Sequence, residues 1–172
     1  MDQSKKFSRH FVTRFSTLPP QAFYVAVASL VIDPDRIRAS LCSYRPGAGK
    51  TVWTAHLLTD AALAVAQVQF DAEQYNSEEE QPYLRVVRGG GSANPPGWNL
   101  TEAWVRPLAG ITSYRTQVQP ILGHDWFATQ VWLTFADVDQ PVELPAQTWD
   151  EYEQERSDKF LTTLRESIPW LS

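Results

Sequence analysis

The sequence has a single cysteine, Cys42, among its 172 residues. One thiol cannot form an intramolecular disulfide, nor can it supply a zinc site built from several thiolates. The chain also has no run of about 18 uncharged apolar residues, so no membrane-spanning helix is predicted. Residues 22–32 are apolar but too short for a span, and no obvious signal-peptide cleavage site accompanies them. We therefore expect a cytoplasmic protein.

Positive charge is also scarce. The chain has 15 Lys and Arg residues against 20 Asp and Glu residues, which gives a net charge of −5. A negative chain is not drawn to nucleic acid phosphates, so a nucleic acid partner is not expected. The N-terminus is the exception, because Lys5, Lys6, Arg9 and Arg14 face only Asp2 there.

Aromatic residues are abundant, with seven Trp, eight Phe and six Tyr. Burial of such large side chains can offset the entropy that is lost on ordering the chain. The length suits a single domain with an appendage. The patterns below divide the chain into an N-terminal helical extension over residues 1–32 and a domain over residues 33–172.

Helical spacing is clearest near the N-terminus. Phe7, Phe11, Phe15 and Leu18 recur at the spacing of one helix face, which predicts a basic amphipathic helix over residues 4–18. Its apolar stripe could pack on the domain's own sheet, enter a membrane interface, or fill a groove on a partner. The next segment, residues 21–32, favours a helix, although its Ala and Val content also suits a strand.

Alternating apolar and polar residues predict strands after residue 36. Three strands over residues 36–71 form a meander, in which Trp53 and Ala55 share one face and Thr54 and His56 the other. Residues 72–100 are a long interruption, with a short strand predicted over residues 83–88. Four more strands are predicted over residues 101–106, 111–119, 127–136 and 142–146. In the third of these, the side chains predicted to face inward are Phe127, Val131, Leu133 and Phe135.

A capped amphipathic helix closes the chain. Thr148 and Glu151 have the spacing of a capping box, in which each side chain satisfies a free backbone N–H of the other residue. Pro169 ends the helix. Its apolar stripe, which we expect to bury on the sheets, consists of Tyr152, Phe160, Leu164 and Ile168.

About seven strands followed by one helix resemble the pleckstrin-homology-like fold. The resemblance implies an α+β fold, mainly antiparallel, in which two near-orthogonal sheets form a barrel capped by the C-terminal helix. Segments Ala55–Ala66 and Thr101–Ile111 are, in addition, similar to an uncharacterised actinobacterial family, which has no known activity. The likeness covers residues 36–168. It implies a binding scaffold, although the hairpin Tyr44–Thr51 supplies only Arg45 and Lys50 for phosphoinositide headgroups.

Catalytic and metal-binding signals are weak. Gly47–Thr51 has glycines, a lysine and a hydroxyl, but the alternation after it predicts a strand rather than the helix of a phosphate-binding loop. The three histidines lack the spacing of metal ligands, so no metal and no cofactor is expected. Cys42 could act as a nucleophile if His56 on the next strand lay beside it. We expect no catalytic residue.

Five aromatic residues are the candidates for a binding surface: Trp132, Tyr114, Trp104, Phe7 and Phe11. If Gln119 pairs with Phe127, Tyr114 lies directly opposite Trp132, and the two rings form an exposed cross-strand pair. The prediction for function is a non-enzymatic protein-interaction or regulatory module with a protein partner. The alternatives are a peripheral membrane protein that uses residues 4–18 and an enzyme that uses Cys42 and His56.

Overall fold

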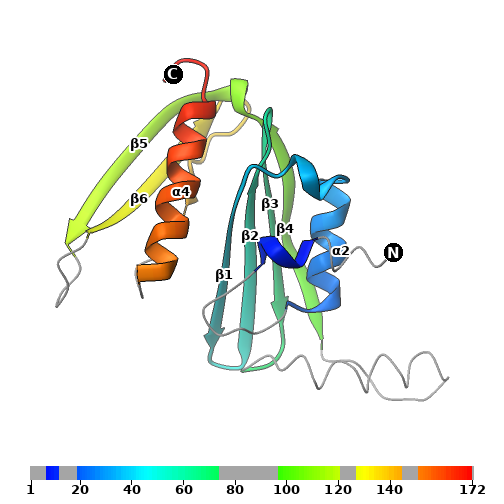
Figure 1. The fold of residues 1–172 in the computed structure, drawn as a ribbon. Helices are drawn as coiled ribbons and strands as arrows, with labels where there is room; N and C mark the ends of the chain where they lie inside the picture. The colour runs from blue at the N-terminus through cyan, green and yellow to red at the C-terminus, as the bar shows by residue number, and fades with distance from the viewer. Residues whose placement is uncertain (1–6, 12–18, 74–96, 121–126, 145–150, 172) are drawn as a thin grey trace, which may run out of the picture.

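The computed structural model describes residues 7–11, 19–73, 97–120, 127–144 and 151–171 (Figure 1). The helices within these ranges are η1 (Ser8–His10), α2 (Gln21–Leu30), η2 (Pro34–Arg36), η3 (Leu108–Gly110) and α4 (Glu151–Ser167), of which the three η elements are short 3-10 helices. The strands are β1 (Ala39–Gly47), β2 (Lys50–Leu58), β3 (Ala62–Phe70), β4 (Trp98–Pro107), β5 (Ile111–Pro120), β6 (Phe127–Phe135) and β7 (Val142–Leu144).

The strands form two antiparallel sheets. The first sheet has the order β1-β2-β3-β4, and the second has the order β5-β6-β7. η3 links β4 to β5 at one end of the molecule, where the two sheets come together, and from there they diverge toward the other end (Figure 1). The molecule is therefore a wedge, with its narrow end at η3.

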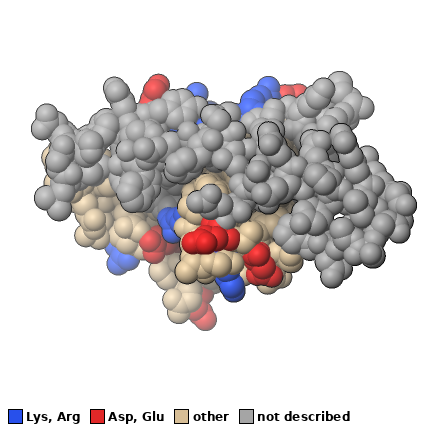
Figure 2. All heavy atoms as spheres, turned by 90° about the horizontal axis from the view of Figure 1, so that it is seen from below, with Lys and Arg blue, Asp and Glu red and all other residues tan. Residues whose placement is uncertain are grey.

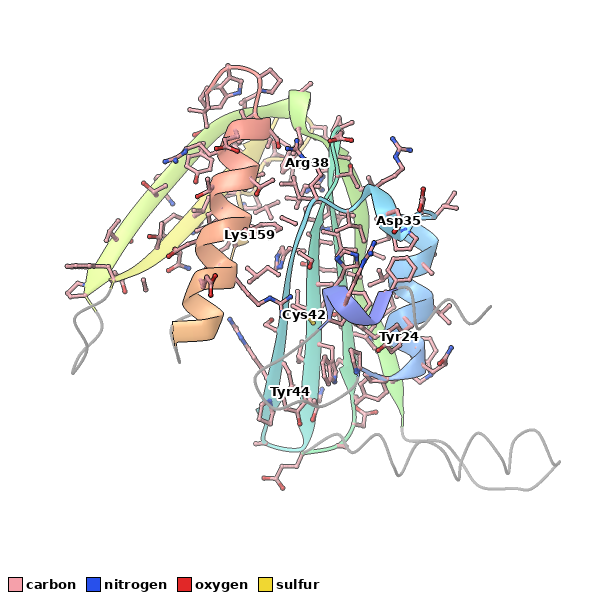
Figure 3. The ribbon with its side chains drawn as sticks, viewed as in Figure 1. Tyr24, Asp35, Arg38, Cys42, Tyr44 and Lys159 are labelled. Atoms are coloured by element: carbon pink, nitrogen blue, oxygen red, sulfur yellow. The ribbon has the colours of Figure 1, made fainter. Side chains whose placement is uncertain are left out.

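Both faces of the first sheet contribute residues to a hydrophobic core. One face, which we call the outer face, packs against α2 and the N-terminal segment, because alternate residues of β2 and β3 point toward them. Tyr24 of α2 and Tyr44 of β1 adjoin this layer (Figure 3). The largest side chains buried in it are Trp53, Phe7, Phe11 and Phe23. The residues between them along the strands face the second sheet.

The inner core fills the narrow end of the wedge. It joins Leu41, Leu58 and Leu63 of the first sheet to Val131 and Leu133 of the second. α4 completes it with Phe160 and Leu164, and Ile168 directly after the helix adds to it; none of the three is exposed to solvent. The predicted burial of these three residues is confirmed. Tyr152 and Thr148 belong to the same prediction, but the side chain of Tyr152 and the whole of Thr148 lie outside the described residues.

The α+β class, the antiparallel pairing and the C-terminal helix are confirmed, as are the meander and the helix after Pro20. A closed barrel is not observed, because the described strands form two separate sheets. Only residues 7–11 of the predicted helix over 4–18 are described, and Ser8–His10 forms a 3-10 helix. The predicted strand over residues 83–88 lies outside the described residues.

One of the four residues of β6 that were predicted to face inward, Phe127, is exposed instead. Phe127 is 56% exposed, whereas Val131, Leu133 and Phe135 are buried as expected. Phe127 is the first residue of β6 and pairs with Pro120, the last residue of β5, so it lies at the end of this hairpin that is farthest from η3. The alternation in β6 is regular, but the inner core does not extend as far as its first residue.

Candidate functional site

The inner face of the first sheet changes character along its strands. Near η3 its side chains are apolar and belong to the inner core, whereas toward the opposite end they are polar. The apolar group is Ala39, Leu41, Leu58, Leu63 and Val65. The polar group is Ser43, Arg45, Thr54, Gln67 and Glu102. Polar side chains are costly to bury without partners, so the core stops where this change occurs and the space beyond it stays open.

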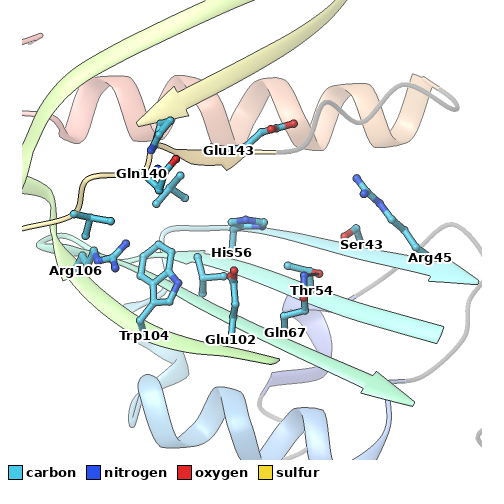
Figure 4. A pocket seen from close by; sticks show the side chains of 14 residues that line it. Ser43, Arg45, Thr54, His56, Gln67, Glu102, Trp104, Arg106, Gln140 and Glu143 are labelled. Atoms are coloured by element: carbon cyan, nitrogen blue, oxygen red, sulfur yellow. Dashed lines mark hydrogen bonds between the residues drawn. The ribbon is translucent and has the colours of Figure 1, made fainter. Parts of the chain in front are cut away.

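This space is a cleft of about 680 Å³ between the two sheets (Figure 4). One wall is the first sheet, from which His56, Trp104 and Arg106 contribute side chains. The opposite wall is residues 138–143, which lead into β7 and include Gln140 and Glu143. Cavities of this volume are typical of ligand sites, so the cleft is the candidate functional site.

Trp104 and Arg106 form the most distinctive feature of the cleft. The guanidinium carbon of Arg106 lies 4.4 Å from the centre of the Trp104 ring and 5.4 Å from that of Phe135. The Arg106 side chain is only 20% exposed, and its Nε lies 4.0 Å from Oδ2 of Asp137, farther than a hydrogen bond. Two aromatic rings and a long ion pair with Asp137 therefore surround this cation.

His56 is buried in the wall of the cleft and packs edge to face on Phe160, with 6.5 Å between ring centres. Burial, with a smaller contribution from the positive charge of Arg45, lowers the pKa of His56 to about 4. The imidazole is therefore neutral at physiological pH, with one nitrogen that donates and one that accepts. It adds a polar group but no charge to the cleft.

A hydrogen-bonded chain crosses three strands in the polar half of the first sheet. Nε2 of Gln67 donates to Oγ1 of Thr54 at 3.1 Å, and Oγ1 of Thr101 donates to Oε1 of Gln67 at 2.8 Å. The Gln67 amide, which lines the cleft, is thus held at both of its polar atoms. This wall is organised before any ligand arrives.

The predicted pair of Tyr114 and Trp132 is wrong. β5 pairs Pro120, not Gln119, with Phe127, so Tyr114 lies opposite Leu133 and Arg115 lies opposite Trp132. A slip of one residue moves every side chain of a strand to the other face of its sheet. Tyr114 consequently packs against the inner core, while Trp132 carries the Arg115 guanidinium 4.6 Å from its ring centre.

The other three candidate aromatics separate into two groups. Trp104 lines the cleft. Phe7 and Phe11 are 1% and 2% exposed, and Phe11 packs edge to face on Phe23 with 5.2 Å between ring centres. Of the three roles considered for their stripe, these two residues take the first, because they pack on the chain's own outer core.

The structure does not bring Cys42 and His56 together. Cys42 pairs with Ala55 and packs with the outer core, whereas His56 faces the cleft on the other side of the sheet. Burial raises the pKa of the Cys42 thiol to about 12, which keeps it protonated and unreactive. The contact on which the enzyme alternative depended is therefore absent.

The glycine-containing segment Gly47–Thr51 forms a hairpin turn and the start of a strand. Gly47–Lys50 closes the β1–β2 hairpin, with Gly49 at a φ of 72°, which a glycine adopts without strain. This hairpin is not a phosphate-binding loop, because a strand follows it.

Across the described parts of the chain, no group of three or more His, Cys, Asp or Glu residues is placed to hold a metal ion. None of the described helices is long and apolar enough to cross a bilayer.

Sequence analysis did not identify the cleft residues Gln67 and Arg106, and it considered His56 only as a partner of Cys42. The signal that could have found them is the change from apolar to polar residues at alternate positions of three neighbouring strands. Comparison with known proteins adds no assignment, since no family model, no curated protein and no solved structure matches this chain.

Proposed function

We propose that this protein is a non-catalytic interaction module that receives an acidic segment of a protein partner in the cleft between its two sheets. The observation that carries the proposal is the Arg106 guanidinium, which is stacked on Trp104 and largely shielded from solvent, and which has no carboxylate of a described residue at hydrogen-bonding distance. A carboxylate from a partner could take up this position, and charged hydrogen bonds of this kind are among the strongest in proteins.

The size of the cleft supports the same conclusion. A volume of about 680 Å³ accommodates a few side chains of an extended segment but not a folded element. Trp104 offers a rigid aromatic surface, and Trp and Arg are the residue types that contribute most to protein interfaces. The Gln67 amide and the neutral His56 imidazole add hydrogen-bonding groups to the same wall.

The charges of the cleft make the interaction specific. Arg45 and Arg106 are positive, whereas Glu102 and Glu143 are negative. The Glu143 carboxylate accepts a hydrogen bond from Nε2 of Gln130, and so it is already engaged. A partner segment that pairs one carboxylate with Arg106 and keeps other negative charges away from Glu102 would fit best.

The order of the elements supports a pleckstrin-homology-like arrangement as the scaffold. Seven described antiparallel strands in two sheets, followed by one helix on the inner core, agree with what that resemblance implies. We propose an open form of it, in which the gap between the sheets is the binding site. The membrane alternative has less support, because the described part of its apolar stripe, Phe7 and Phe11, is buried.

A peptide titration tests the proposed function. We would follow the Trp104 indole and His56 imidazole signals by NMR while adding a library of short acidic peptides, each with a counterpart in which Gln or Asn replaces the acidic residues. We expect at least one acidic peptide to shift both signals to saturation and its amide counterpart to bind at least about tenfold more weakly.

Arg106→Ala should abolish this binding, and Arg115→Ala is the matched control. Arg115 is also stacked on a tryptophan, but on Trp132 outside the cleft. If no peptide shifts the cleft signals, or if both variants weaken binding equally, the cleft is not the interaction site.

A further inference from the structure

A second groove lies at the edge of the first sheet, where the start of β1 meets η1 and α4. It has a volume of about 320 Å³, and we call it the basic groove. Its polar lining residues are Arg9, His10, Arg38, Ser40, Arg156 and Lys159. Arg38 and Lys159 approach it from different elements (Figure 3). It lies at the opposite end of β1 from the hairpin that contains Lys50.

The charge of the basic groove contrasts with that of the chain. Four Arg and Lys side chains and one histidine line it, and no described Asp or Glu residue does so, although the net charge of the chain is −5. On the described face seen from below, by contrast, acidic and basic side chains are mixed (Figure 2). The concentration of positive charge in the groove is therefore local and is not a property of the whole surface.

Two of the arginines in the groove pair with carboxylates at its rim. Asp35 accepts a hydrogen bond from Nη2 of Arg9 at 2.5 Å, and Asp60 lies 3.5 Å from Nε of Arg38. Both carboxylates are 72% exposed, so water screens their effect within the groove. Lys159 forms no ion pair with any described residue. Positive charge inside the groove is thus only partly offset.

His10 is held in the groove by its neighbours. Nε of Arg9 donates to Nε2 of His10 at 3.1 Å, and Nδ1 of His10 lies 3.5 Å from the Ser40 hydroxyl. Nη2 of Arg156 donates to the His10 carbonyl at 3.4 Å, which fixes the arginine of α4 beside η1. Burial and the charges of Arg9 and Arg156 lower the pKa of His10, as expected where positive potential is concentrated.

We propose that the basic groove binds a phosphoryl group. A phosphate dianion has several acceptor oxygens, and the groove directs donors of the matching kind at one small space from three elements. Guanidinium groups pair with phosphate through two parallel hydrogen bonds, and an ammonium group such as that of Lys159 acts as a point charge. The groove has room for the phosphoryl group and the adjoining atoms of a small molecule or a lipid head.

The test follows the His10 imidazole by NMR in the full chain during addition of inorganic phosphate, at constant ionic strength maintained with chloride. We expect a saturable shift with a dissociation constant below about 10 mM, and a rise in the His10 pKa because the bound anion favours the protonated ring. Lys159→Ala should weaken binding by about tenfold. Lys50→Ala removes the same charge from the exposed β1–β2 turn and should leave binding unchanged.

Vesicles identify the source of the phosphoryl group. Sedimentation would compare phosphatidylcholine vesicles with and without phosphatidic acid. Binding that requires phosphatidic acid and is lost in Lys159→Ala assigns the groove to a lipid head, whereas binding of soluble phosphate alone assigns it to a small molecule. The proposal is overturned if phosphate leaves His10 unshifted, or if Lys159→Ala and Lys50→Ala weaken phosphate binding equally.

Discussion

The thiol of Cys42 is made inert by its surroundings. It packs beside the outer core, and burial raises its pKa to about 12. We expect iodoacetamide at pH 8 to alkylate the folded protein at least about a hundredfold more slowly than the same protein in urea, because the thiolate is the reactive form. Mass spectrometry of timed samples measures both rates. Equal rates would mean that the thiol is accessible and its pKa unperturbed, whereas alkylation faster than in urea would mean that it is activated and would revive the enzyme alternative.

His56 should make the stability of the fold depend on pH. Its pKa is about 4 in the fold and near 6.5 when exposed, so between these pH values only the unfolded chain binds the proton. The free energy of unfolding should therefore fall as the pH falls from 6.5 to 4. The loss due to His56 is roughly 3 kcal/mol.

Urea unfolding across this pH range, compared with that of His56→Leu, isolates the contribution of one imidazole. The variant lacks the titrating group, so its stability should depend less on pH than that of the wild type. Parallel pH profiles for the two proteins would show that the His56 ring is not desolvated in the folded state.

At the scale of elements, α4 is the helix that closes the inner core. Phe160 is fully buried there, so Phe160→Ala should lower the free energy of unfolding by about 3–5 kcal/mol. Glu166 lies on the exposed side of the same helix, and Glu166→Ala should change stability by no more than about 0.5 kcal/mol. Denaturant unfolding measures both. A small effect of Phe160→Ala would contradict the packing of α4 on the sheets.

The elements themselves were predictable because their signals are local. Alternation in β2 and β3 and the helical spacing of Phe160, Leu164 and Ile168 follow from geometry within each segment. The register between two strands, by contrast, is not determined by a pattern within either strand. The register of β5 against β6 shifts between Ile111 and Ser113, and periodicity does not reveal such a shift.

The error in register had a direct consequence for the candidate site. It exchanged the faces of Tyr114 and Arg115, and with them the predicted partner of Trp132. Trp104 was a candidate residue and lies in the cleft, but the sequence did not show its neighbours there, which come from residues 138–143 and from β2 and β3. Contacts so distant in sequence depend on how two sheets are placed, which local patterns do not encode.

At the scale of the whole molecule, the wedge follows from the use of both faces of one sheet. The outer face of the first sheet is covered along its strands, whereas its inner face is apolar only near η3. The second sheet and α4 cover that apolar part and leave the polar part lining the cleft. The change from apolar to polar residues along the inner face of the first sheet therefore accounts both for the closed core under α4 and for the open cleft.

The claim that the cleft receives the partner is tested most directly by photo-crosslinking from two faces. One variant carries a photoreactive phenylalanine analogue in place of Gln140 in the cleft wall, and a second carries it in place of Arg115 outside the cleft. Each would be irradiated with its native partners present, and the adducts identified by mass spectrometry. We predict one defined adduct from position 140 that disappears when Arg106→Ala is added, and none from position 115. An adduct from position 115 alone, or one from position 140 that persists with Arg106→Ala, would contradict the account.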